Sequence, residues 1–163
     1  MQRMNAHSDL DAIDRRILQA LQADGRLTYD EIAGRAGLSA SAVLRRVRRL
    51  EAAGVIAGYV ALLRPEAVGL RLTAYLNVRL EKHAQAHKRT PMDLFKAAVQ
   101  AWPEVVECVS LTGETDYLLR VLVRDMAHYA RFVSDTLLRH PSVQDCRSSF
   151  VLERVKETTG LPI

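Results

Sequence analysis

The chain has 163 residues, which is enough for one ordinary domain or two small ones. Its composition, 48% apolar and 26% charged, is that of a globular protein with a core, and its net charge of +4 favours polyanions only weakly. No apolar run is long enough for a membrane span, the first residues have no secretory pattern, and two cysteines do not make a disulfide framework. We therefore expect a cytoplasmic protein that works away from membranes.

Three short helical patterns follow one another before residue 65. Asp9 is the expected N-cap of the first, and Thr28 begins the second as part of a capping box with Glu31. The second pattern ends at Gly37, and the third starts shortly afterwards. A tight turn that contains glycine between two short helices is typical of a helix-turn-helix.

The third helical pattern has two unlike faces. One face is apolar, with Val43, Val47 and Leu50. The polar residues that we assign to DNA contact lie opposite this face or at its edges: Ser39, Ser41, Arg45, Arg46, Arg48 and Arg49. Guanidinium groups in a major groove can fork onto guanine or grip phosphate, so this helix is predicted to bind double-stranded DNA. The alternative is that these arginines form only a solvated face.

The segment after Gly54 is rich in β-branched and aromatic residues. Residues 55–62 are therefore predicted to form a short strand or hairpin, the wing of the domain. Residues 66–71 are predicted to be a linker. The first domain is thus expected over residues 1–65 and the second over residues 72–163.

The second half of the chain alternates strand and helix patterns. Strands are expected over residues 72–80, 105–112, 117–123 and 143–152, a polar loop over residues 81–89, and helices after Thr90 and Asp125. The order βαββαβ is that of a split ferredoxin-like domain. The sequence therefore predicts an α+β protein, with a winged helix-turn-helix before a ferredoxin-like domain.

Two helices on one face of such a sheet would leave its other face uncovered. That face is expected to hold Tyr75, Leu118, Leu122 and Phe150. Exposed apolar patches of this kind usually mark sites of association. Two-fold pairing also suits DNA, because paired recognition helices match half-sites about one helical turn apart. We therefore expect a homodimer.

The loop before the third strand combines two carboxylates, a hydroxyl group and a glycine. Carboxylates could hold an ammonium group, and backbone N–H groups could hold a carboxylate, so the loop suits a free amino acid. The alternative is a hairpin turn with no ligand. The residues assigned to effector binding are Thr112, Gly113, Glu114, Thr115, Asp116, Tyr117, Met126 and Leu138. No cofactor, metal or enzymatic activity is expected, because no metal cluster, phosphate loop or nucleophile–base spacing is present.

Several short motifs stand in order along the chain. They include Asp24-Gly25-Arg26, Gly37-Leu38-Ser39, Arg46-Val47-Arg48-Arg49-Leu50-Glu51, Gly54-Val55-Ile56, Asp116-Tyr117-Leu118-Leu119 and Thr136-Leu137-Leu138. With these motifs, nearly the whole chain resembles the Lrp/AsnC, or feast/famine, family of transcriptional regulators. The resemblance implies an asnC-type helix-turn-helix at about residues 29–48 and a C-terminal effector domain of the RAM type.

The resemblance also implies how such a protein would assemble and respond. Its dimers would form tetramers or octamers, and an amino acid would bind between dimers near residues 113–117. Leucine and methionine are the favoured effectors. The expected function is therefore sequence-specific, amino-acid-modulated control of transcription at the nucleoid. The alternative is a nucleoid-type architectural DNA-binding protein that needs no ligand.

Overall fold

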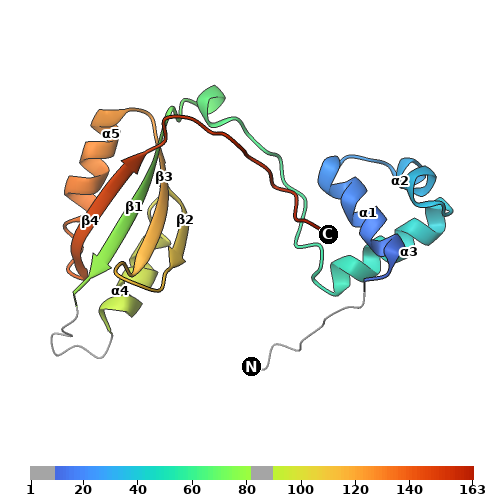
Figure 1. The fold of residues 1–163 in the computed structure, drawn as a ribbon, viewed down its shortest axis with the longest axis horizontal. Helices are drawn as coiled ribbons and strands as arrows, with labels where there is room; N and C mark the ends of the chain where they lie inside the picture. The colour runs from blue at the N-terminus through green and yellow to red at the C-terminus, as the bar shows by residue number, and fades with distance from the viewer. Residues whose placement is uncertain (1–9, 82–89) are drawn as a thin grey trace. The chain divides into compact units, whose positions relative to one another are not determined.

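The computed structural model describes residues 10–81 and 90–163, which form two compact units (Figure 1). One unit contains residues 10–61 together with Lys156–Ile163, and the other contains Leu62–Val155. The polar loop predicted over residues 81–89 lies, apart from its first residue, outside the described ranges. No helix within these ranges is long and apolar enough to cross a membrane.

Three helices make up the first unit: α1 (Ala12–Ala23), α2 (Tyr29–Ala36) and α3 (Ala40–Ala52). The cap of α1 is Asp11, which forms a capping box with Asp14, and not Asp9, which lies outside the described residues. A reciprocal carboxylate explains the difference, because Asp14 stands three residues after Asp11 whereas Ala12 stands three after Asp9. The capping box predicted at Thr28 is confirmed.

The turn between α2 and α3 has the geometry of a helix-turn-helix. Gly37 ends α2 with a φ of 71°, a left-handed conformation that a side chain would strain. The Ser39 hydroxyl then caps α3 by accepting a backbone amide of its first turn at 3.3 Å. On its buried side, α3 packs Val43 and Val47 into a core shared with Ile17 of α1, so the three helices hold one another in place.

The wing expected over residues 55–62 forms no strand or hairpin in the single chain. Ile56 packs against the core of the first unit, but Val60, Leu62 and Leu63 are at least 70% exposed. A lone segment has no neighbouring strand to receive its backbone hydrogen bonds. A β-forming composition is therefore not sufficient to make a ladder here.

The second unit is an antiparallel sheet with helices on one side. Its elements are the 3₁₀-helix η1 (Pro65–Val68), which occupies part of the predicted linker, β1 (Leu72–Leu80), α4 (Pro91–Val99), β2 (Val105–Ser110), β3 (Tyr117–Val123), α5 (Met126–Arg131), its π-helical continuation η2 (Phe132–Leu137) and β4 (Val143–Phe150). The strand order is β2-β3-β1-β4. The βαββαβ topology predicted from the sequence is therefore confirmed, with Cys108 and Cys146 on opposite edge strands.

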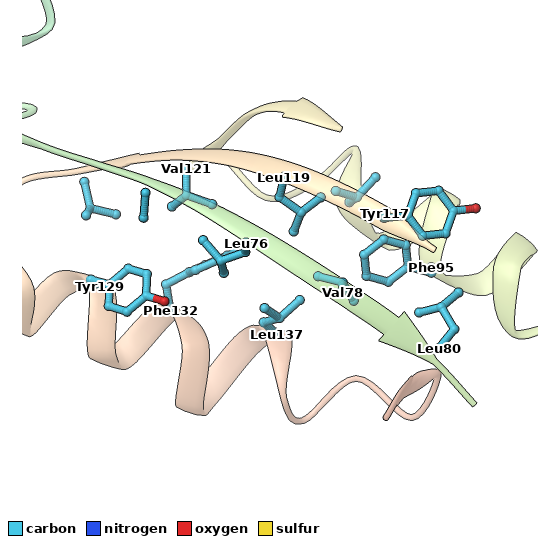
Figure 2. Packing of buried hydrophobic residues seen from close by; sticks show 13 residues of the cluster. Leu76, Val78, Leu80, Phe95, Tyr117, Leu119, Val121, Tyr129, Phe132 and Leu137 are labelled. Carbon is cyan, nitrogen blue, oxygen red and sulfur yellow. The ribbon is translucent and has the colours of Figure 1, made fainter. Parts of the chain in front are cut away.

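The core of the second unit lies between the sheet and its helices (Figure 2). Alternate residues of β1 point toward the helical layer, where Leu76 lies beside Phe132 and Val78 lies beside Phe95. Phe95 of α4 packs on Tyr117 of β3 with their ring centroids 4.9 Å apart. Because strand side chains alternate, the residues between these core positions lie on the opposite face of the sheet.

That opposite face is less apolar than the sequence predicted. Tyr75 and Leu118 lie there and are half-buried, as expected. Leu122, in contrast, is only 8% exposed. Phe150 was placed on the wrong face, because it packs against Tyr129 of α5 with ring centroids 4.9 Å apart. The register explains this, since Phe150 pairs with a core-facing residue of β1.

The C-terminal segment Lys156–Ile163 belongs to the first unit and pairs with α1. The Gln19 side-chain amide donates to the Ile163 carbonyl at 2.6 Å, and that of Gln22 donates to the Leu161 carbonyl at 3.3 Å. The Leu161 amide donates in turn to the Gln22 side chain. After β4, the chain therefore returns to the unit in which it began.

Candidate functional site

The outer side of α3 carries two exposed arginines, Arg45 and Arg48. They lie three residues apart, so they share one helix face, opposite the buried Val43 and Val47. Neither forms an ion pair with any residue in the described ranges. Exposed and unpaired guanidinium groups are able to reach a phosphate or a base edge.

The other two arginines of α3 are held by carboxylates of α1. Arg46 donates to Asp11 at 2.7 Å and to Asp14 at 2.8 Å, and Arg49 donates to Asp14 at 2.5 Å. The bonds to Asp11 and Asp14 raise the pKa of Arg46. The hydrogen bond from the Asp14 backbone amide has the largest effect on Asp11 and lowers its pKa, and the hydrogen bond from Arg46 lowers it further. These two predicted DNA contacts are thus engaged inside the protein.

The two serines predicted to contact DNA have different environments. The Ser39 hydroxyl caps α3 and lies 3.1 Å from the Ser41 hydroxyl. Ser41 is exposed, and it is four residues before Arg45 on the same helix face. Ser39 therefore shapes the start of the helix, while Ser41 extends its exposed face.

Asp116 holds the loop that precedes β3. Its Oδ2 accepts the Leu80 amide at 2.7 Å, and its own amide donates to the Val78 carbonyl at 3.0 Å. This carboxylate therefore ties the loop to the end of β1. Tyr117 follows it but points into the core, where it is 2% exposed and burial raises the pKa of its hydroxyl. The Tyr117 side chain does not reach the surface on which we expected an effector.

A polar cleft lies beside this loop on the uncovered face of the sheet. Its lining consists of Asn77, Arg79, Glu114, Thr115, Asp145 and Arg147. The register of β1 and β4 assembles it, because Asn77 pairs with Arg147 and Arg79 pairs with Asp145. Across the described residues, none of the four charged side chains forms an ion pair. Two guanidinium and two carboxylate groups can receive both ends of a zwitterion.

Sequence reasoning found the loop side of this cleft and missed its strand side. Glu114 and Thr115 were predicted, and Thr112 and Gly113 are exposed in the same loop. The missing residues occupy polar positions in the alternating patterns of β1 and β4. These polar positions can be seen in the sequence, but that they form one site follows only from the register of the two strands.

The apolar part of the predicted effector site is not brought to the cleft within one chain. Met126 and Leu138 are 54% and 49% exposed. Met126 begins α5 and Leu138 follows η2, so both lie in the helical layer, which covers the other face of the sheet. Met126 also follows the far end of β3, roughly 20 Å along the strand from the loop.

A larger hollow, of about 610 Å³, lies in the first unit next to α2 and α3. It is lined by Tyr29, Leu44 and Tyr59 and by the carboxylates of Asp30 and Glu51, but by no basic side chain. A DNA phosphate or an amino-acid carboxylate would find no cation there. The polar cleft of the second unit is therefore the better candidate for an effector site.

Known protein families match both units of the chain. Residues 10–57 match the winged helix-turn-helix DNA-binding family, and residues 73–161 match the Lrp/AsnC ligand binding domain. The chain is 43% identical to the leucine-responsive regulatory protein of Escherichia coli (strain K12) over 155 residues, which cover 95% of this chain and 92% of that protein. The same identity and coverage hold for the leucine-responsive regulatory protein of Salmonella typhimurium.

Solved structures extend the likeness to three dimensions. A transcriptional regulator from Neisseria meningitidis, crystallised with L-methionine, has a TM-score of 0.89 and 49% identity, covering 94% of this chain and 96% of that one. The feast or famine regulatory protein from M. tuberculosis, complexed with L-methionine, has a TM-score of 0.80 and 37% identity, covering 93% and 98%. With both domains matched and relatives alike over nearly their full length, the chain belongs to the Lrp/AsnC family of ligand-modulated transcriptional regulators, which are not enzymes.

Proposed function

We propose that the protein is an amino-acid-responsive regulator that binds double-stranded DNA at the bacterial nucleoid through the outer face of α3. The exposed and unpaired state of Arg45 and Arg48, with Ser41 on the same face, is the observation that carries this proposal. A helix with such a face suits the major groove, where arginine forks onto guanine or binds phosphate. Ser39, Arg46 and Arg49 have supporting roles within the domain.

The DNA interface is tested by the double variant Arg45→Ala with Arg48→Ala. Duplexes selected from a random pool by the parent protein serve as binding sites. We expect the double variant to lose retardation of these duplexes, while its circular dichroism stays that of the parent. Arg131→Ala with Arg139→Ala removes the same charge from exposed positions of the second unit and should bind normally. Retardation by the α3 variant at the parent's level would overturn the proposed interface.

We propose that the effector is an L-amino acid bound at the polar cleft, with methionine the first choice and leucine the second. Two structural relatives were crystallised with L-methionine, and other relatives are named leucine-responsive. In this arrangement Arg79 and Arg147 would bind the carboxylate, and Glu114 and Asp145 the ammonium group. The four unpaired charges around one cleft support this assignment.

The size of the cleft suggests that one chain does not complete the site. Its volume of about 20 Å³ is close to the space of a single water molecule. An amino acid would therefore lie over the cleft, and another surface would have to enclose it. A second copy of the chain is the surface that we propose, and Met126 or Leu138 of such a copy could supply an apolar wall.

The effector site is tested by calorimetry with the twenty common amino acids at millimolar concentration. We expect heat from methionine or leucine, and its loss in Arg147→Gln. Arg139→Gln, which removes the same charge from an exposed turn of the same unit, is the matched control. Asp116→Ala is a poorer probe because it also unpairs the Leu80 amide. Absence of heat from every amino acid would instead favour a ligand-independent architectural protein.

We also propose that the protein is a homodimer that assembles into tetramers or octamers. Tyr75 and Leu118 leave apolar surface on the uncovered face of the sheet. Val60, Leu62 and Leu63 add three exposed apolar side chains in a segment without a strand partner. Burying these surfaces between copies would remove apolar area from water, which is the usual driving force for association.

A further inference from the structure

The four arginines between residues 45 and 49 divide into two pairs with opposite environments. Arg45 and Arg48 are exposed and form no ion pair with the described residues. Arg46 and Arg49 both donate to Asp14, whose side chain is only 1% exposed, at 2.8 and 2.5 Å. One helix therefore presents two free guanidinium groups and two that are already neutralised.

The carboxylates that neutralise this second pair are themselves fixed. Asp11 accepts the Asp14 amide at 2.7 Å through one oxygen and Arg46 at 2.7 Å through the other. Asp14 belongs to the first turn of α1 and faces the Asp11 amide in the same capping box. Both carboxylates are thus held by the backbone of α1 and cannot follow an arginine that turns toward another anion.

Stability does not require a charge network at this place. The buried Asp14 carboxylate loses hydration, and well-packed apolar residues often hold two helices together as well as such an ion pair does. A network does, however, change how α3 meets a polyanion. Each guanidinium that reaches a phosphate releases counterions and strengthens binding to any DNA sequence. Withdrawing two of four arginines therefore weakens sequence-independent binding more than it weakens base recognition.

We propose that Asp11 and Asp14 are specificity-determining residues, which hold Arg46 and Arg49 away from DNA phosphates so that α3 contacts DNA through Arg45 and Arg48. The inference rests on the DNA interface proposed above. In this role Asp14 is a positioning residue: it touches no DNA and acts through the two arginines. Specific binding keeps its contacts, while non-specific binding loses two cations for each helix.

The first test compares neighbouring arginines of α3 by the salt dependence of binding to a random-sequence duplex. Each phosphate contact contributes about 0.9 to the slope of log K against log salt. We expect Arg48→Gln to lower that slope by about 0.9 for each bound helix and Arg49→Gln to leave it unchanged. Both residues are exposed, and both variants lose one charge, so each is the other's control. An equal fall in both would overturn the inference.

The second test frees one of the withheld arginines. Asp14→Asn keeps the size of the side chain and removes the carboxylate charge that holds Arg49, while Asp11 still holds Arg46. We expect its slope to become steeper by about 0.9 for each helix, and its preference for selected over random duplexes to fall. Asp24→Asn, the same charge change at the other end of α1, should leave both quantities unchanged. An unchanged slope in folded Asp14→Asn would contradict the inference.

Failure of the inference and failure of the interface give different results. If the parent and Arg45→Ala with Arg48→Ala bind DNA alike, the interface itself is wrong. If that double variant loses binding while Arg49→Gln behaves like Arg48→Gln, only the role of the carboxylates is wrong. The Arg49→Gln comparison also decides the question if Asp14→Asn does not fold, because Arg46 still neutralises Asp14 in that variant.

Discussion

Asp11 combines a capping bond and an ion pair at the start of α1. Its carboxylate accepts the Asp14 amide and the Arg46 guanidinium, each at 2.7 Å. Both bonds favour the charged form, so the pKa of Asp11 lies below its ordinary value of 3.8. The carboxylate therefore stabilises the fold above that pH, and this contribution is lost as the pH falls through the lowered pKa.

Asp11→Asn tests this linkage, because asparagine caps a helix about as well as aspartate but does not titrate. We expect the first unit of the parent to be more stable than that of the variant at neutral pH. The difference should shrink as the pH falls below 3.8. Thermal unfolding followed through the α1 amide signals by NMR measures it. A difference that stays constant from neutral pH to acid would contradict this account of Asp11.

Residue roles could be predicted where they depend on neighbours along one element. The cap at Thr28 and the exposure of Arg45 both follow from spacing within a helix. The partners of Arg46 could not be predicted, because Asp11 and Asp14 are 35 and 32 residues away along the chain. That contact depends on how α1 packs across α3, which no local pattern records.

At the scale of elements, the turn between α2 and α3 depends on the backbone of Gly37. Its φ of 71° is easily reached only by glycine. We expect Gly37→Ala to destabilise the first unit by about 1 kcal/mol, measured by chemical denaturation. Gly34→Ala is the matched control, since the new methyl group would meet nothing within 4 Å in a helix, where alanine is favoured by about 1 kcal/mol. Equal effects of the two substitutions would contradict the role of the turn.

Most elements could be predicted because their signals are local. Alternation predicted the observed bounds of β1, and the apolar segment after the glycine-containing loop predicted those of β3. The N-cap of α4 at Thr90 stands where the sequence predicted it. The prediction of a strand or hairpin over residues 55–62 was wrong, because a strand needs a partner and this segment has none in the single chain. The strand side of the polar cleft, four of its six lining residues, was missed for a similar reason, since only the register of β1 and β4 assembles it.

At the scale of the whole molecule, the uncovered sheet face should control assembly. We expect the parent to sediment as a dimer or larger species, and Leu118→Arg to shift it toward monomer by placing a charge in the buried interface. Leu152→Arg is the control, because Leu152 is 99% exposed and lies outside the sheet. A monomeric parent, or unchanged assembly of Leu118→Arg, would show that this face does not join the copies.

If the proposed function holds, an amino acid bound to the second unit changes the DNA affinity of the first. The most direct test is an anisotropy titration of one selected duplex, with and without millimolar L-methionine, on the same protein preparation. We expect a change of at least about fivefold in the Kd for this duplex, typical of coupling between two sites, and loss of this change in Arg147→Gln. An unchanged Kd in the presence of every one of the common amino acids, with tight DNA binding throughout, would contradict the proposed function.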